Sequence, residues 1–249
     1  MNKFYVEKET KRARRASRLY RLLEVLEYME EDLLCDNPHI GKLDEDEKEL
    51  SIYVYRCDGD ERSIVNRIRE IEDLADFKVN IARSIGYGMG IEDLYRAIGD
   101  LVERDTLDLL KPLAIETAKK GGIEYIAVLL RSGLWILLEG EKHRVRMPWI
   151  EESIAIAHTH PPGGCIPSRP DLESCLELLS NGGILCGVLS VECSFMLRLM
   201  SPLSIECYEH FTRIINRYYD LLGTVKDARD FIVLFRDQCK SVNITISPL

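Results

Sequence analysis

The sequence predicts a globular α/β protein, built on a mixed sheet flanked by helices and preceded by an N-terminal, mostly helical α/β extension. The chain has 249 residues, enough for one large domain or two small ones. Hydrophobic residues make up 46% and charged residues 30%, which is typical of a folded, soluble protein. Apolar residues recur every three or four positions in some segments and form short β-branched runs in others, so both helices and strands are expected.

The elements of the extension, residues 1–104, follow from this spacing. Residues 10–35 are predicted to form a helix with one apolar stripe, consisting of Leu19, Leu22, Leu23, Leu26, Met29 and Leu33. Further along, we expect a loop around His39, an acidic linker at 44–49, a strand at 50–57, a helix at 61–75 and a strand at 77–85. The glycine-rich residues 86–90 lack the GK[ST] and GxGxxG patterns of phosphate-binding loops, so we interpret them as a turn.

The second domain, residues 105–249, is predicted to be a mixed α/β unit. A helix at 91–103 is expected just before it and a helix at 107–119 at its start. A Ser132-Gly133 turn between two apolar runs, 123–131 and 134–139, indicates a β-hairpin. The remaining elements are expected as strands at 153–157, 184–191, 195–200 and 242–246 and as helices at 171–179, 205–222 and 225–239.

Charge and hydropathy exclude several classes of protein. The formal net charge of −9 argues against a nucleic-acid-binding protein. No apolar run approaches the roughly 20 residues of a membrane span, and the N-terminus resembles no secretory signal. We therefore expect a cytoplasmic protein with no membrane or nucleic-acid partner.

The eight cysteines are scattered and contain no CxxC pair, so a four-cysteine zinc site is not expected. Cysteines of cytosolic proteins are normally reduced. However, Gln238 is the only glutamine, and the chain is rich in Glu, Lys and Arg, as hyperthermophile proteins tend to be. Intracellular proteins of such organisms do contain disulfides.

The most informative segment is residues 157–171, AHTHPPGGCIPSRPD. His158 and His160 are two residues apart, so on a strand both imidazoles point to the same face. Asp171 opens the next helix and offers a carboxylate as a third ligand. Two histidines, one aspartate and a water are a ligand set with an open position, as in catalytic zinc sites.

Two structural explanations compete with this interpretation. Ser168 and Asp171 also fit a helix capping box, and a histidine pair on a buried strand is more often structural. The joint spacing HxH-x₇-SxxD favours a metal site, and prolines and glycines in the intervening loop would hold the ligands rigidly. Capping and metal binding are also compatible.

The segment matches the HxH-x₇-SxxD signature of the JAMM (MPN+) metalloproteases, and the resemblance covers roughly residues 105–200. This family has a glutamate at the start of the strand after its first long helix. Glu124 is the candidate here, with Glu116 and Glu139 as alternatives. The resemblance implies a zinc-dependent hydrolase of amide bonds, often an isopeptidase that removes a ubiquitin-like protein from lysine.

The resemblance also implies a role for each residue. His158, His160 and Asp171 would bind Zn²⁺, which lowers the pKa of a bound water toward ~7. Glu124 would act as the general base and then protonate the leaving amine, and Ser168 would stabilise the oxyanion. Only 33 residues separate Glu124 from His158, which resembles archaeal and other prokaryotic members more than eukaryotic deubiquitinases.

Three other functions stay open. They are a JAMM peptidase or amidohydrolase with a different substrate, a non-catalytic interaction module, and other zinc chemistry such as nucleoside deamination. Deamination would need an H-x-E motif with a P-C-x-x-C partner, which the sequence lacks.

Two further expectations concern packing and partners. A short crossover should place the strand of Cys186 beside the histidine strand, so Cys165 and Cys186 are expected to lie close enough for a disulfide. Residues 1–110 carry a net charge of −8 and residues 111–249 only −1. We therefore expect the extension to fold separately, to supply no catalytic group and to modulate access or partners. Docking to a larger complex, pairing with a second copy of the chain and autoinhibition are all open roles.

Overall fold

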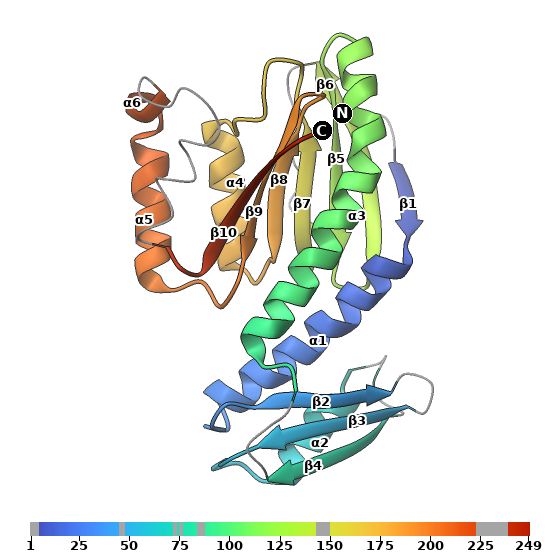
Figure 1. Ribbon diagram of the computed structural model, residues 1–249, viewed down its shortest axis with the longest axis vertical. Coiled ribbons are helices and arrows are strands. Elements are labelled where there is room, and N and C mark those ends of the chain that lie inside the picture. The colour runs from blue at the N-terminus through green and yellow to red at the C-terminus, as the bar shows by residue number, and fades with distance from the viewer. Residues whose placement is uncertain are drawn as a thin grey trace. The chain divides into compact units, whose positions relative to one another are not determined.

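The computed structural model describes residues 5–44, 48–71, 74, 77–83, 88–142, 150–222 and 239–249. The helices are α1 (Lys11–Glu31), α2 (Glu61–Arg69), α3 (Ile91–Lys119), α4 (Arg169–Ser180), α5 (Ile205–Asn216) and α6 (Tyr218–Leu222). The strands are β1 (Tyr5–Glu9), β2 (His39–Asp44), β3 (Glu49–Val54), β4 (Lys78–Arg83), β5 (Ile123–Leu130), β6 (Leu134–Lys142), β7 (Ser153–Thr159), β8 (Leu185–Leu189), β9 (Cys193–Leu199) and β10 (Val242–Pro248). The predicted mixed α/β architecture is thus confirmed (Figure 1).

The chain divides into two compact units, and the division corrects the expected boundary at 104/105. Unit 1 combines Met1–Ser17 with Ile98–Leu249, and unit 2 is Arg18–Ala97. The N-terminal residues belong to unit 1 because β1 pairs antiparallel with β6. In addition, the Thr10 hydroxyl donates a hydrogen bond to Asp105. Unit 2 is therefore inserted into unit 1 rather than placed before it.

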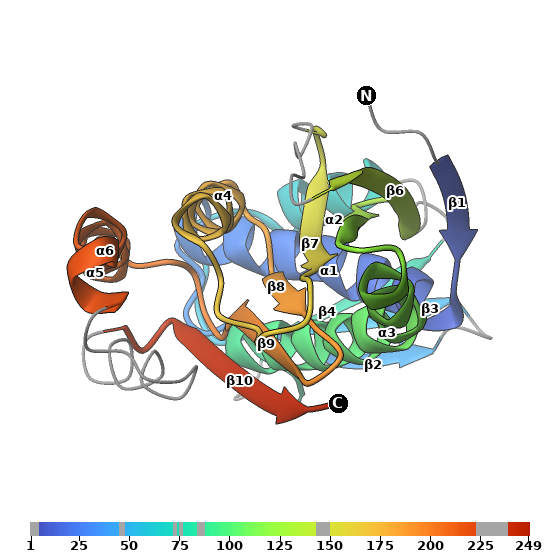
Figure 2. The ribbon, with the colours of Figure 1, turned by 90° about the horizontal axis from the view of Figure 1, so that it is seen from above.

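The described strands of unit 1 form one seven-stranded sheet in the order β1-β6-β5-β7-β8-β9-β10. All its neighbours are antiparallel except β7 and β8, which are parallel and joined through α4. This pairing confirms that the histidine strand lies beside the strand of Cys186. The unit 1 part of α3 and the helix α4 lie on opposite faces of β7 and β8 (Figure 2). Helices on both faces explain why β5 and β7 are almost continuously apolar.

The predicted hairpin of β5 and β6 forms, but its connection has three residues, Arg131 to Gly133, instead of two. Gly133 adopts a φ of +84°, a left-handed conformation that favours glycine. A Cβ on Gly133 would also come within 3.2 Å of the Ala13 carbonyl oxygen and of Ser17. The glycine is therefore required both by the turn and by the approach of α1.

The two helices expected at 91–103 and 107–119 form the single helix α3. Between them, Asp105 is 4% exposed and accepts a hydrogen bond of 2.8 Å from Trp135 Nε1. The tertiary partner removes the reason for the helix to end at this polar segment. Helix propensity is a weak preference that packing often overrides.

Unit 2 contains a three-stranded sheet in the order β2-β3-β4 and the helix α2, with the adjoining parts of α1 and α3. The strand β2 was not expected, because Pro38 and Gly41 suggested a loop around His39. His39 instead pairs with Tyr53 of β3. The core of the α1 stripe, Leu22, Leu23, Leu26 and Met29, is 0–1% exposed, as its spacing requires.

Two helices are predicted near the C-terminus. The segment expected as one helix at 205–222 is interrupted at Arg217, which caps α5. The helix expected at 225–239 lies almost entirely outside the described residues. Among the helices that the structure describes, none is both long and apolar enough to cross a membrane.

Candidate metal centre

The three predicted ligands come from β7, the loop after it and the first turn of α4. His158 lies on β7, and His160 follows its last residue, so the strand alternation directs both imidazoles to the face covered by α4. Asp171 lies in the first turn of α4, at the position N3 of its capping box. The sequence spacing thus becomes a single spatial cluster.

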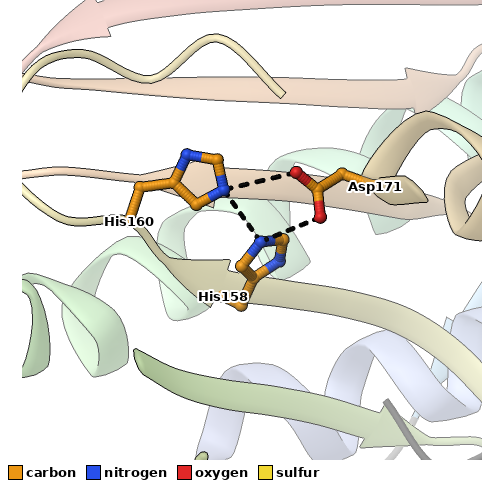
Figure 3. Close-up of side chains that lie close together, drawn as sticks. All are labelled: His158, His160 and Asp171. Carbon is orange, nitrogen blue, oxygen red and sulfur yellow. Dashed lines mark hydrogen bonds and ion pairs between the residues drawn. The ribbon is translucent and has the colours of Figure 1, made fainter. Parts of the chain in front are cut away.

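The ligand atoms of this triad converge on one point (Figure 3). The Nε2 atoms of His158 and His160 lie 3.0 Å apart. The Asp171 Oδ1 lies 3.2 Å from His158 Nε2, and its Oδ2 lies 3.3 Å from His160 Nε2. One ligand atom from each residue lies within 4.8 Å of the others.

These distances fit a small divalent cation. Two atoms held 2.0–2.1 Å from zinc at the tetrahedral angle are about 3.3 Å apart. The donor set of two imidazoles and one carboxylate is also one that zinc prefers, and three protein ligands leave a fourth position open. The side chains of His160 and Asp171 are 17% and 18% exposed, so the cluster is reached from solvent.

The capping box predicted at Ser168 forms together with the cluster. The Ser168 backbone N–H donates a 2.6 Å hydrogen bond to Asp171 Oδ2, and the Asp171 N–H donates a 3.3 Å hydrogen bond to Ser168 Oγ. The carboxylate is therefore oriented by the helix terminus and by the histidines at once. Because Ser168 Oγ accepts this bond, its own proton is available to another acceptor.

Burial alone would raise the pKa of Asp171. The hydrogen bonds with His158 and His160, the charge of His158 and the hydrogen bond with Ser168 outweigh burial and hold that pKa far below its usual range. Asp171 is consequently a carboxylate at every physiological pH, which is the form that binds a metal.

Glu124 lies on β5 on the same face of the sheet as the triad. Ile126 of β5 pairs with His158. Glu124 lies two residues before Ile126 on β5, so its side chain points to the same face as the side chains of Ile126 and His158. Glu124 is 9% exposed, and burial raises the pKa of its carboxyl to about 7, opposed by the charge of His160 and assisted by that of Asp171.

The alternatives Glu116 and Glu139 lie elsewhere. Glu139 pairs with Tyr125, so it points to the face opposite Glu124. Glu116 is on α3, which packs on that opposite face. Both carboxylates approach the ammonium group of Lys120, at 3.7 and 3.9 Å. Of the three candidates, the structure brings only Glu124 to the triad.

The expected disulfide between Cys165 and Cys186 is wrong, although all eight cysteines are paired. Cys165 bonds Cys193, and Cys186 bonds Cys175; the other pairs are Cys35–Cys57 and Cys207–Cys239. Cys186 pairs with Ile156 in the sheet, two residues before His158. It therefore lies beneath α4, where Cys175 reaches it, and not beside the loop after His160.

The two disulfides fix both sides of the ligand cluster. Cys165 anchors the loop between His160 and Ser168 to the first residue of β9. Cys175 anchors α4, one turn after Asp171, to β8. Between α4 and β8, beside His158 and Asp171, lies a mainly apolar cavity of about 20 Å³, which has room for a water molecule.

Sequence reasoning missed the residues that support the site from a distance. Tyr218 of α6 donates a 2.7 Å hydrogen bond to the Pro167 carbonyl, next to Ser168. Burial and the nearby Asp171 charge raise the Tyr218 pKa, so the phenol keeps the proton that it donates. No local pattern links residues 51 positions apart. Thr159, which also supports the site, does have a local signal. It lies between the two histidines on a strand, so strand alternation directs its side chain to the face opposite theirs.

Comparisons with protein-family models, curated proteins and solved structures found no match to this chain. The chemistry of the site is therefore inferred from its own residues and from the resemblance of its motif.

Proposed function

We propose that the chain is a zinc-dependent hydrolase of amide bonds, and that its substrate is the isopeptide bond between the tail of a ubiquitin-like protein and a lysine. The observation that carries the proposal is the convergence of His158, His160 and Asp171 beside a buried glutamate, Glu124, on one face of the sheet. The match to the JAMM signature supports the same reaction and suggests the substrate class.

The ligands in this proposal are the three residues of the triad. Zinc bound there would supply a Lewis acid that polarises the scissile carbonyl and makes a water molecule acidic near neutral pH. Asp171 contributes a negative charge that the capping box keeps oriented. The histidines contribute imidazole nitrogen ligands from the end of β7 and the residue that follows it.

Glu124 handles the proton. Its carboxylate accepts a proton from the attacking water as the water oxygen bonds to the carbonyl carbon. The same carboxyl then gives the proton to the amine nitrogen as the C–N bond breaks. The products are a free carboxylate on the ubiquitin-like tail and a free lysine amine, so one water is consumed for each bond cleaved.

Ser168 stabilises the developing oxyanion. Its oxygen is held by the Asp171 N–H, and its own proton remains for the substrate oxygen. The Tyr218 phenol and the Cys165–Cys193 disulfide hold the loop that carries Ser168. Preorganised donors of this kind act without moving when the charge develops.

The test is cleavage of lysine-linked ubiquitin-like conjugates by the full-length, zinc-loaded protein. Cleavage that stops with a zinc chelator, returns with zinc, and is absent in Glu124→Gln would support the proposal. Cleavage of linear peptides alone would retain the hydrolase and remove the isopeptide specificity. Bound zinc without hydrolysis of either substrate would contradict the proposal and favour a non-catalytic module.

A further inference from the structure

The residue between the two histidines, Thr159, is linked to Glu124 by a buried hydrogen-bond chain. The Tyr125 N–H donates to Thr159 Oγ1 at 2.9 Å. Thr159 Oγ1 lies 2.6 Å from Thr117 Oγ1 on α3. Both threonines are 0% exposed. The chain therefore joins β5, β7 and α3 without water.

One order of donors makes all of these hydrogen bonds at once, because each hydroxyl has one proton. Thr117 donates its proton to the Leu113 carbonyl at 3.1 Å, one turn earlier in α3. Thr117 can then only accept from Thr159, and Thr159 accepts from Tyr125. The order is Tyr125 N–H to Thr159, Thr159 to Thr117, and Thr117 to Leu113.

This hydrogen-bond chain lies where the strands β5 and β7 separate. Their ladder runs as far as the pair Ile126–His158. Beyond that pair, the His160 N–H donates a 2.6 Å hydrogen bond to the Leu189 carbonyl of β8, so the polypeptide after β7 turns away from β5 and toward β8. The Thr159 hydroxyl accepts the Tyr125 N–H at the point where the backbone ladder ends.

The Tyr125 N–H belongs to the peptide group that joins Glu124 to Tyr125. The Thr159 hydroxyl therefore holds the backbone of Glu124 directly, on the face opposite its carboxylate. The other residues that β7 directs toward this face near Thr159 are Ala155 and Ala157, both buried. A hydroxyl in such surroundings is costly unless it is hydrogen-bonded.

We propose that Thr159 is a positioning residue, which fixes Glu124 on the face of the triad through its hydrogen bonds with Tyr125 and Thr117. The inference rests on the proposed function, in which Glu124 must reach the attacking water. A displacement of about 1 Å in a reacting group can cost on the order of 10²-fold in rate. Thr159 acts through Glu124 and touches neither substrate nor metal.

The decisive variant is Thr159→Val, which keeps the shape and removes the hydroxyl. We expect its kcat on a conjugate substrate to fall about 10- to 100-fold, with KM unchanged and about one zinc ion still bound per chain. Thr159→Ser keeps the hydroxyl and should restore most of the loss. Thr117→Val, which removes the acceptor for Thr159, should show a smaller fall in kcat.

Thr106→Val is the matched control. Thr106 is also on α3 and 0% exposed, but its hydroxyl has no hydrogen-bond partner in the described part of the chain. The same substitution there should leave kcat and zinc content at the wild-type values.

Two NMR measurements test the positioning independently of activity. In Thr159→Val, the Tyr125 amide should exchange with solvent about tenfold faster or more, because it loses its acceptor. The ¹³C resonance of the Glu124 carboxyl should also shift, and neither change should occur in Thr106→Val. Wild-type exchange and an unmoved Glu124 resonance in Thr159→Val would overturn the inference.

The outcomes separate this inference from the proposed function. If the wild-type protein cleaves no conjugate, the proposed function fails, while the two NMR measurements still decide whether Thr159 positions Glu124. If Thr159→Val loses its zinc, Thr159 acts on the histidines instead, and the inference is overturned. If Thr159→Val is unfolded, Thr117→Val carries the kinetic and Glu124 resonance measurements, with Thr159→Ser as the control that keeps the hydroxyl.

Discussion

The two units of the chain use the same stabilising devices for different purposes. Unit 1 has a seven-stranded sheet, three disulfides and the triad of His158, His160 and Asp171, whereas the described part of unit 2 has a three-stranded sheet, one disulfide and no such cluster. In unit 1, the disulfides of Cys165 and Cys175 hold ligand-bearing segments. In unit 2, the Cys35–Cys57 disulfide connects the segment after α1 to the segment after β3 and adjoins no candidate site. Equivalent covalent bonds should therefore differ in what their loss affects.

The largest difference is expected between histidines of the two units. His160→Ala should abolish metal binding and hydrolysis, because two ligands do not hold zinc tightly. His39→Ala, in β2 of unit 2, should keep about one zinc per chain. Metal analysis of protein purified without chelators measures both. Full zinc content in His160→Ala would remove His160 from the ligand set.

Glu124→Gln should lower kcat by ~10²–10⁴-fold and leave zinc bound, because it removes the group that transfers the proton. Glu139→Gln is the control, since Glu139 lies on the neighbouring strand but on the other face of the sheet. Single-turnover kinetics with a quantified zinc content separates the two effects. A fall of less than about tenfold in Glu124→Gln would assign the proton transfer to another residue.

Ser168→Ala tests the two roles of one hydroxyl. We expect kcat to fall ~10²–10³-fold from loss of the oxyanion contact. We also expect about 1 kcal/mol less stability from loss of the helix cap. Ser204→Ala removes the equivalent N-cap of α5, whose oxygen accepts from the Cys207 N–H at 3.2 Å, and should show the stability loss alone. Equal kcat values in the two variants would reduce Ser168 to a cap.

Replacing both cysteines of a disulfide by serine should lower stability by about 3–4 kcal/mol in either unit, because the bridges close similar loops, with separations of 28 residues for Cys165–Cys193 and 22 for Cys35–Cys57. Of these two bridges, only Cys165–Cys193 should weaken zinc binding when it is lost, since it holds the loop between His160 and Ser168. Denaturant unfolding and zinc titration of both variants give the comparison. Equal zinc affinities would show that the loop needs no covalent anchor.

The smallest effect concerns a half-buried carboxyl of unit 2, that of Glu27. Glu27 accepts a 2.7 Å hydrogen bond from the Tyr95 hydroxyl, and burial raises its pKa above the usual value for glutamate. An acid with a raised folded-state pKa stabilises the protein below its unfolded-state pKa, and that stability is lost as the pH rises through the folded-state pKa. The free energy of unfolding of Glu27→Gln, measured relative to that of the wild type, should therefore be higher at pH 8 than at pH 4. Urea unfolding of the two proteins measures this difference. The same difference in unfolding free energy at pH 4 and at pH 8 would contradict the prediction.

The sequence by itself determined most of the local chemistry. The i, i+2 spacing of His158 and His160 is enough to put both rings on one face of a strand, and the capping box places Asp171 at a helix start. These relations depend on the geometry of one strand, one loop and one helix turn. The apolar stripe of α1 and the order of strands and helices after residue 105 were also predictable, because periodicity is a local property.

Only the tertiary structure decided which distant residues meet. Three glutamates were compatible with the sequence, and the register of β5 against β7 and β6 brings Glu124 to the triad and turns Glu139 away. The disulfide pairing was predicted incorrectly because it depends on where Cys186 lies along β8, under α4 and away from the loop after His160. Knowing that β7 and β8 are neighbours does not give that position. The strand β1 and the division into units depend on the pairing of Tyr5–Glu9 with residues about 130 positions later. Local patterns carry no information on such contacts, because the free energy that selects them comes from burial and hydrogen bonding across the whole sheet.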